Sequence, residues 1–164
     1  MNVIFLDIDG VLNSQDTVET CNGLIGIDSD KVARLAEIVN TNNAKLLLTS
    51  SWRRHWWKRE RDTDEQHPVG EYLDKKLAEH GLKIHDVVSY VGFNRGRAIK
   101  DWISSCPDVV DSYIILDDDE FDYGESEVGL LGHLVKTSFY GKDGGLQDTH
   151  VRFANRKFKN PPPN

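Results

Sequence analysis

The sequence has little cysteine and no long apolar run, and each shortage excludes a class of protein. Only Cys21 and Cys106 occur among 164 residues, which is no disulfide framework and too few for a structural zinc site. No stretch approaches the roughly 18 consecutive apolar residues of a membrane helix. The first residues include no basic region, and Asp7 already interrupts the apolar run, so we expect no signal peptide. A reducing cytoplasm is the expected location.

Charge is unevenly distributed along the chain. The net charge is −7, from 27 acidic and 20 basic residues, and a uniformly acidic protein would be repelled by nucleic acid. Residues 53–61 nevertheless carry five arginines and lysines, whereas residues 117–122 carry five carboxylates. The net charge therefore counts against a simple DNA-binding module, but it conceals a basic segment at 53–61 and an acidic pole at 117–122.

Strand-like and helix-like patterns alternate along the chain. Continuous apolar runs are typical of strands buried on both faces, and they predict strands at 3–6, 45–49, 113–116 and, less strongly, at 84–91 and 134–137. Helical spacing predicts a helix that starts near residues 28–30 and ends at 40–43, and further helices at 69–80, 96–105 and 147–159. We predict one α/β domain over residues 1–159, with a mostly parallel sheet, and a flexible proline-rich tail over residues 160–164.

Three predicted strands end in polar side chains that suit phosphate chemistry. In chain order these are Asp7 and Asp9, then Thr49 and Ser50, then Asp117 and Asp118. Residues that follow parallel strands converge on one edge of the sheet, where ligands bind. A site built only from oxygen ligands favours a hard cation, and Mg²⁺ is usual beside a phosphate. Either acidic pair alone could be a surface or capping pair, but both follow buried strands.

These groups have the chemistry needed for phosphoryl transfer. An aspartate beside a metal ion can attack a phosphate and form an aspartyl-phosphate. We expect Asp7 to be the nucleophile, Asp9 the general acid and base, and Thr49 a donor to the phosphate. A cation is needed opposite the metal, and three candidates stand together: Arg95, Arg97 and Lys100. Arg95 precedes a predicted helix start, where free backbone N–H groups would add to an anion site.

Four segments resemble, in the same order, the motifs of the haloacid dehalogenase (HAD) phosphohydrolase superfamily. Residues 5–13 resemble the first motif, with its two aspartates, and residues 46–52 resemble the second, a hydrophobic strand that ends in threonine or serine. Residues 94–99 match the third motif through Arg95, and residues 114–118 match the fourth, an acidic pair. The first and fourth motifs are the specific ones.

The resemblance implies a three-layer Rossmann-like fold, dependence on Mg²⁺ and an aspartyl-phosphate intermediate. It makes Asp7 both nucleophile and metal ligand. Asp9 becomes the acid and base and binds the metal through its carbonyl group. Asp117 and Asp118 complete the metal site. Arg95 is the implied cation of the third motif, although Arg97 and Lys100 compete for that role, and Ser50 could replace Thr49.

Shorter features are similar to one branch of the superfamily. Residues 49–53, the arginine–glycine helix start at 95–96, and residues 134–137 followed by 145–146 resemble the small HAD domain of Swiss Army Knife RNA-repair-type proteins. More distantly, they resemble the phosphatase domain of phage polynucleotide kinase-phosphatases. No kinase P-loop is present, so no kinase activity is expected. The intervals 14–48 and 54–94 are too short for a full cap domain, which predicts a minimal cap and an open site.

Tryptophans and basic residues alternate directly after the second motif. Such a pattern can stack on bases and neutralise phosphates, which suits a single-stranded nucleic-acid end or a nucleotide as the phosphorylated substrate. Trp56 and Trp57 could equally pack their helix on the sheet. We assign to substrate binding five residues, with Arg53 as a second phosphate clamp: Ser50, Trp52, Arg53, Arg97 and Lys100.

Other functions fit some of the same residues. A small-metabolite phosphatase would need the same catalytic core. A phospho-receiver module also uses acidic pairs with threonine and lysine, but its phospho-acceptor follows the third strand rather than the first. A phosphomutase must exclude water with a substantial cap, and none is visible. The sequence leaves the oligomeric state open.

Overall fold

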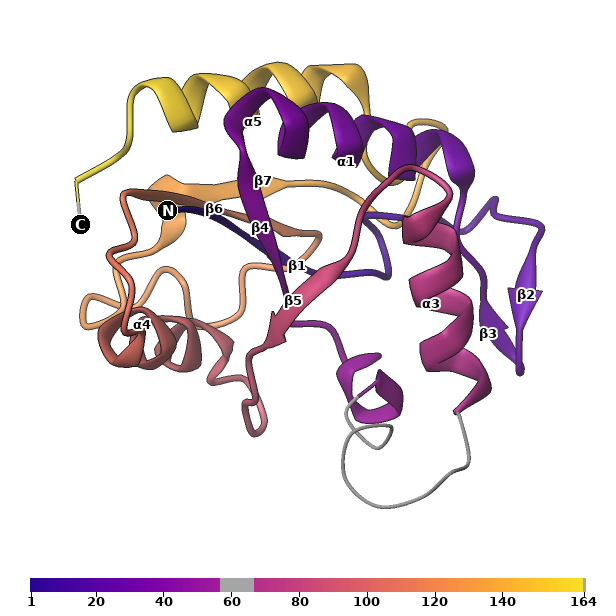
Figure 1. The fold of residues 1–164 in the computed structure, drawn as a ribbon, viewed down its shortest axis with the longest axis horizontal. Helices are drawn as coiled ribbons and strands as arrows, with labels where there is room; N and C mark the ends of the chain where they lie inside the picture. Colours follow the sequence, from indigo (N-terminus) through magenta and orange to yellow (C-terminus); the bar gives the residue numbers. More distant parts are fainter. Residues whose placement is uncertain (57–66, 164) are drawn as a thin grey trace.

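A computed structural model of the chain describes residues 1–56 and 67–163, so part of the basic segment predicted at 52–61, including Trp57, lies outside the described residues. Figure 1 shows the elements, which alternate as expected for an α/β chain. The strands are β1 (Asn2–Leu6), β2 (Thr20–Cys21), β3 (Leu24–Ile25), β4 (Ala44–Leu48), β5 (Ile84–Val87), β6 (Ser112–Asp117) and β7 (Leu134–Lys136). The helices are α1 (Ser29–Asn42), α3 (Pro68–Ala78), α4 (Arg95–Ser105), the short η1 (Leu131–His133) and α5 (Asp148–Lys159).

Five parallel strands form the central sheet, in the order β5-β4-β1-β6-β7. The central strand β1 pairs with β4 on one side and β6 on the other. Leu6 is opposite both Leu48 and Leu116, so the three strands end at the same level. Chain order reverses at β1, and ligands bind at such a switch point in open α/β sheets. The register therefore gathers at one edge the polar residues that follow β1, β4 and β6.

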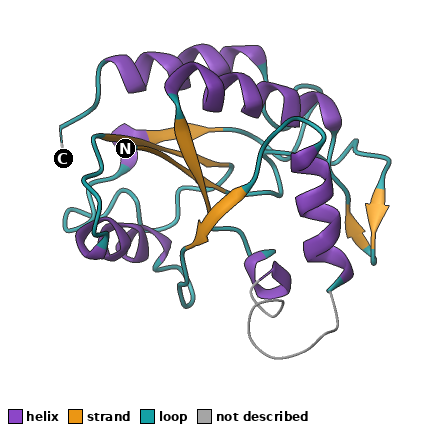
Figure 2. Cartoon of the chain, viewed as in Figure 1, coloured by secondary structure: helices purple, strands orange, loops and turns teal. Residues whose placement is uncertain are grey.

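Helices cover both faces of the sheet, which confirms the predicted three-layer Rossmann-like fold (Figure 2). Alternate side chains of each central strand point to opposite faces. Ile4 and Leu6 pack in the core shared with α1, α3 and α5, whereas Val3 and Phe5 pack in the core shared with α4. Both faces are fully buried, which is why the strands read as continuous apolar runs. Figure 1 shows α1 and α5 side by side over one face and α4 beneath the other.

A small antiparallel hairpin, β2–β3, is the part of the fold that the sequence analysis missed. Its turn is Asn22-Gly23, and both residues have positive φ, of 51° and 79°. Two consecutive positive φ values are required by a type I′ turn, and Asn-Gly is its preferred pair. The hairpin packs beside α3, where the Tyr72 hydroxyl accepts a 2.9 Å hydrogen bond from the Ile27 N–H. It is the only addition that the chain makes between the turn after β1 and α1.

Most predicted boundaries shift by one or two residues, and the largest difference is at the end of β5. Helix α1 continues through Asn42 because Asn43 adopts the left-handed conformation, with φ of 47°, and ends the helix there. Strand β5 ends at Val87 rather than at residue 91, and residues 88–94 form a loop that leads into α4. Among the described residues no helix is long and apolar enough to span a membrane.

Candidate active site

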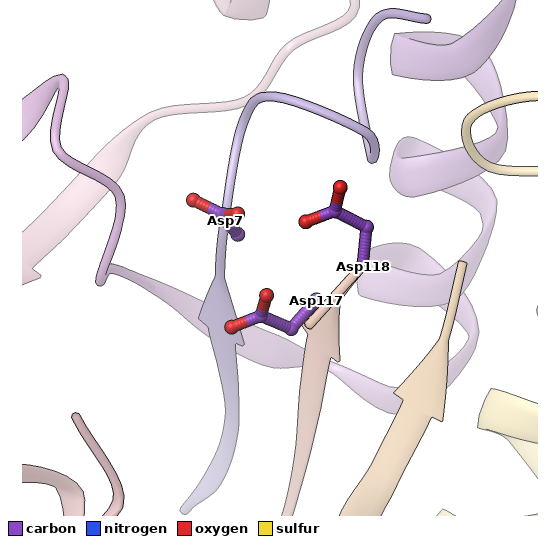
Figure 3. A group of neighbouring side chains, drawn as sticks. All are labelled: Asp7, Asp117 and Asp118. Carbon is purple, nitrogen blue, oxygen red and sulfur yellow. The ribbon is translucent and has the colours of Figure 1, made fainter. Parts of the chain in front are cut away.

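Three carboxylates meet at the ends of the two neighbouring strands β1 and β6. Asp7 follows β1, Asp117 is the last residue of β6, and Asp118 comes next. One oxygen from each lies within 4.8 Å of the others, and Figure 3 shows the three side chains facing one shared space. Asp7 and Asp117 are buried and Asp118 is half-buried. We call these three residues the carboxylate cluster.

The turn after β1 is shaped to let Asp118 approach. Gly10 has a φ of 79°, and a Cβ atom there would lie 2.4 Å from the Asp118 carboxylate, so no other residue fits without a shift. The Gly10 N–H donates to the Asn13 side chain at 2.9 Å, and its carbonyl accepts from the Thr137 hydroxyl at 2.6 Å. These two bonds attach the turn to Asn13 on one side and to Thr137, which directly follows β7, on the other.

Burial disfavours the fully ionised form of the carboxylate cluster. Desolvation is the main cause that raises the pKa of Asp7 to about 7, and the nearby charge of Asp117 adds to it. Desolvation, then the charge of Asp7, raises the pKa of Asp118 to about 6. Burial also raises the pKa of Asp117, although Arg95 opposes that shift. Buried carboxylates whose charges repel in this way are suited to a hard divalent cation such as Mg²⁺.

Arg95, the first residue of α4, is the one of the three candidate cations that contacts the cluster. Its Nη1 lies 2.6 Å from Asp117 Oδ2 and 3.4 Å from Asp7 Oδ1. Burial disfavours the charged guanidinium, but the two carboxylates more than offset this and raise the pKa of Arg95. The Tyr123 hydroxyl donates a second hydrogen bond to Asp117, at 2.7 Å. Arg95 therefore neutralises part of the cluster and leaves the rest to another cation.

Arg97 and Lys100 are turned away from the cluster. Arg97 pairs with Glu125 at 3.0 Å and Glu127 at 3.3 Å, and Lys100 donates to the Glu127 carbonyl at 2.9 Å. Their charges are engaged in these contacts on the exposed side of α4, and the substrate-binding role predicted for them stays a prediction.

The start of α4 also differs from the expected anion site. The Asp122 carboxylate accepts from the Gly96 N–H at 2.5 Å and from the Arg97 N–H at 3.1 Å. A protein carboxylate thus occupies the helix N-terminus, where a phosphate was expected to bind. The residue that does so was missed by the sequence analysis, which read Asp122 only as part of the acidic pole.

Thr49 and Ser50 follow β4 and reach the same edge of the sheet. Both are fully buried. The Ser50 hydroxyl hydrogen-bonds to Asp7, which lowers the pKa of Asp7 and partly offsets its burial. The Thr49 hydroxyl has no hydrogen-bond partner within the described residues. A buried hydroxyl without a partner is costly, so the Thr49 side chain is suited to bind a ligand oxygen.

Asp9 lies beside the cluster rather than in it. Its carboxylate accepts one hydrogen bond from the Asn13 side-chain amide at 2.9 Å and another from the Trp52 indole N–H at 3.2 Å. These two donors fix the orientation of the side chain. The set of mutually close carboxylates therefore contains Asp7, Asp117 and Asp118, and the predicted contribution of the Asp9 carbonyl stays a prediction.

Trp52 and Arg53 take structural positions instead of the predicted open ones. Trp52 is only 2% exposed and packs against Tyr72, which leaves its ring little free surface for a base, and its predicted substrate contact stays a prediction. The buried Arg53 donates to the carbonyls of Ser50 at 3.1 Å and Tyr90 at 2.9 Å. Its guanidinium therefore joins two loops of the site, and its role as a phosphate clamp stays a prediction.

Aromatic side chains from two other loops gather beside Arg95. Tyr90 and Phe93 precede α4, and Phe121 follows β6. The Phe121 ring lies 6.2 Å from Tyr90 and 6.3 Å from Phe93, between centroids. We call these three residues the aromatic pad. Sequence reasoning missed the pad because single aromatics in loops have no pattern, although each stands within five residues of a motif.

The arrangement offers a nucleophilic carboxylate, a buried cation and an unsatisfied hydroxyl around one space. Such a set can hold a phosphate and attack it. A comparison with known families gives one match: residues 3–151 match the family described as the HAD domain in Swiss Army Knife RNA repair proteins. No curated protein and no solved structure matches the chain.

Proposed function

The chain belongs to the family of HAD domains in Swiss Army Knife RNA repair proteins, and from this premise we propose that it is a magnesium-dependent phosphomonoesterase. The family indicates phosphohydrolase activity. One observation carries the finer proposal: the carboxylate cluster, Asp7 with Asp117 and Asp118, is buried at the ends of β1 and β6 and is only partly neutralised by Arg95.

The donor set fits Mg²⁺. Three carboxylates provide only oxygen ligands, and their raised pKa values reflect charge that burial and mutual repulsion disfavour. Asp7, Asp117 and Asp118 would hold the ion. When bound, Mg²⁺ would offset the negative charge of the cluster and of the phosphate.

Asp7 and Asp9 would divide the reaction between them. The Asp7 carboxylate attacks phosphorus, the bond from phosphorus to the leaving oxygen breaks, and Asp9 gives that oxygen a proton. Asp9 then takes a proton from the water that attacks the aspartyl-phosphate, which releases inorganic phosphate and restores Asp7. The hydrogen bonds from Asn13 and Trp52 support this role because they hold Asp9 beside the nucleophile.

Thr49 and Arg95 would hold the other phosphate oxygens and the nucleophile. The Thr49 hydroxyl, which lacks a partner among the described residues, donates to a phosphoryl oxygen. Arg95 keeps Asp7 and Asp117 in place through its two ion pairs. The energetic advantage is that both groups are already oriented before the phosphate arrives.

We propose that the phosphate belongs to a nucleic-acid end or a nucleotide. The description of the matching family, which names RNA repair proteins, supports this substrate class. The fold supports it as well, since the hairpin β2–β3 is the only addition between the turn after β1 and α1, and a polymer end needs an approach that a large cap would block.

Phosphate release with and without Mg²⁺ tests the proposal. Wild-type protein, Asp7→Asn and the control Asp101→Asn, at an exposed carboxylate on α4, are compared on four substrates. These are an aryl phosphate, a nucleoside monophosphate, and single-stranded oligonucleotides that carry a 3′- or a 5′-phosphate. We expect Mg²⁺-dependent release that Asp7→Asn abolishes and Asp101→Asn retains, fastest on a nucleotide or an oligonucleotide end. Release that survives Asp7→Asn would contradict the mechanism, and a preference for small base-free phosphates would contradict the substrate class.

A further inference from the structure

The aromatic pad is unusual because it exposes apolar rings beside a polar site. The side chain of Phe93 is 76% exposed, and its neighbour Val91 is 84% exposed in the same loop between β5 and α4. Tyr90 and Phe121 are half-buried behind Phe93. Exposed aromatic surface that gathers at the mouth of a site is typical of ligand binding, whereas scattered apolar residues are not.

The pad is connected to the carboxylate cluster by direct contacts. The guanidinium of Arg95 lies 3.9 Å from the centre of the Phe121 ring and 4.8 Å from that of Tyr90. The Tyr90 hydroxyl accepts a 2.5 Å hydrogen bond from Arg95 Nη2. Since the same guanidinium binds Asp7 and Asp117, the pad begins one side chain away from the nucleophile.

The backbone of Phe121 indicates that this placement has a cost. Its φ is 40°, in the left-handed region that a bulky residue rarely adopts. Strained residues of this kind cluster at functional sites. Here the strained residue is the one whose ring covers Arg95 and joins Tyr90 to Phe93.

Charge favours one occupant for the pad. The exposed Asp119 and Glu120, which precede Phe121, would repel a second phosphate, and Glu120 pairs with Lys136 at the end of β7. On the pad side, two guanidiniums lie against Tyr90, that of Arg53 at 3.8 Å and that of Arg95 at 4.8 Å from the ring centre. A ligand that is both anionic and planar, such as a nucleotide, is therefore drawn to the pad side.

We propose that the aromatic pad stacks the base of the nucleotide whose phosphate enters the carboxylate cluster, with Phe93 as the outer stacking surface. This rests on the proposed phosphomonoesterase function. The pad makes the base the recognised part of the substrate. Stacking on an aromatic ring tolerates every base, so it selects nucleotides over base-free phosphates without selecting a sequence.

Substitutions at Phe93 test the pad. Phe93→Ala removes the ring, and Phe93→Leu keeps an apolar side chain without a π face. The matched control is Phe153→Ala on α5, another exposed phenylalanine with an arginine, Arg156, near its ring. For each protein, kcat/KM is measured for a phosphorylated oligonucleotide, a nucleoside monophosphate, ribose 5-phosphate and a phosphotyrosine peptide. Stacking is worth about tenfold per base, so the ratio of nucleotide to ribose 5-phosphate should fall about tenfold in both Phe93 variants.

A binding measurement separates failure of the pad from failure of the proposed function. An oligonucleotide with 2-aminopurine beside its terminal phosphate is titrated with Asp7→Asn protein, since stacking quenches its fluorescence without turnover. Quenching that Phe93→Ala removes and Phe153→Ala retains supports the pad, even if no substrate is hydrolysed. The pad proposal is overturned if the quenching does not depend on Phe93. It is also overturned if the Phe93 variants keep the wild-type ratio of kcat/KM for nucleotide to that for ribose 5-phosphate, or if Phe93 instead favours the phosphotyrosine peptide. Absence of Mg²⁺-dependent hydrolysis on every substrate overturns the proposed function alone. If the Phe93 variants lose kcat/KM on the oligonucleotide but not on the nucleoside monophosphate, the stacked base belongs to the end of a polymer.

Discussion

The carboxylate cluster and the aromatic pad share Arg95 but differ in almost everything else. In the cluster, Asp7 and Asp117 are buried, and Arg95 and the Tyr123 hydroxyl bind Asp117, whereas the pad is apolar and reaches the surface at Phe93. Chemistry at phosphorus needs fixed, desolvated charge, and recognition of a planar group needs an accessible face. From this difference we expect that the proposed catalysis and recognition can be changed separately on this scaffold, and the following experiments test that separation.

The largest effect is expected at the residue that the two regions share. Arg95→Met removes the partner of two buried carboxylates, so we expect kcat/KM to fall about a thousandfold. The free energy of unfolding should fall by about 3–5 kcal/mol without Mg²⁺, because a buried charge loses its partner. Steady-state kinetics and denaturant unfolding measure both. The matched control is Arg34→Met, which also removes an arginine between two carboxylates, Asp30 and Asp148, but on the surface. Similar losses in both variants would contradict the special position of Arg95.

Of the two regions, we expect the carboxylate cluster and not the aromatic pad to respond to pH. With pKa values of about 7 for Asp7 and about 6 for Asp118, both carboxylates are largely protonated at pH 5.5 and ionised at pH 8. Mg²⁺ competes with these protons, so its apparent affinity should rise about a hundredfold between pH 5.5 and pH 8. In the metal-free protein the sign is opposite: the folded state keeps protons that the unfolded state has released, so these groups' contribution to stability falls as pH rises from about 4 to about 7.

Thermal unfolding with and without Mg²⁺ at the two pH values measures this effect. The Mg²⁺-induced rise in Tm should be large at pH 8 and small at pH 5.5. Asp118→Asn serves as the comparison variant, since it removes a ligand and one repelling charge. It should raise the Tm of the metal-free protein at pH 8 and lose most of the Mg²⁺ response. Equal responses to Mg²⁺ at both pH values would show that the cluster is not the site of binding.

A pair of tryptophans tests how far the catalytic region extends. Trp52→Phe and Trp56→Phe each remove an indole N–H that donates to a carboxylate, Asp9 in the first case and Asp74 in the second. A hydrogen bond to a charged group is worth about 1.5–3 kcal/mol, so we expect kcat to fall about tenfold in Trp52→Phe. Trp56→Phe should keep the wild-type kcat. An equal effect of the two substitutions would show that loss of packing, and not orientation of Asp9, is responsible.

The smallest effect should come from the hydroxyl that links pad and cluster. Tyr90→Phe removes the acceptor for Arg95 Nη2 but keeps the ring. We expect kcat to fall about threefold, because one hydrogen bond that positions Arg95 is lost. Selectivity for base-bearing substrates should remain, since the stacking surface is intact. Tyr140→Phe, at an exposed tyrosine, is the control. A loss of selectivity without a change in kcat would reverse the roles assigned to the hydroxyl and the ring.

The sequence predicted the carboxylate cluster far better than the pad, for a physical reason. Asp7 and Asp117 follow strands whose double-sided burial shows in their composition, and parallel strand ends must converge, so their meeting could be expected. The fold class was confirmed on the same basis. The roles of the individual site residues stay predictions, which the experiments above address.

The contacts that the sequence did not predict concern side chains whose direction depends on loops. Trp52 follows the second motif, as noted from the sequence, but the chain turns so that its ring enters the core. Phe121 comes to lie on Arg95 only through a backbone conformation that composition does not reveal. Asp122 fills a helix N-terminus that is 26 residues distant in sequence. Contacts of this kind are set by tertiary structure rather than by local pattern.

The two hydrogen bonds from the start of α4 to Asp122 have a consequence for the proposed reaction. The Gly96 and Arg97 N–H groups donate to the Asp122 carboxylate, which ties the segment after β6 to the start of the helix that carries Arg95, the partner of Asp117. In the reaction proposed above, charge would shift between Asp7, phosphorus and the leaving oxygen while the surrounding dipoles stay still. In water, every such shift would require solvent molecules to reorient. In this site the dipoles would be oriented once, when the chain folds, and not again at each turnover.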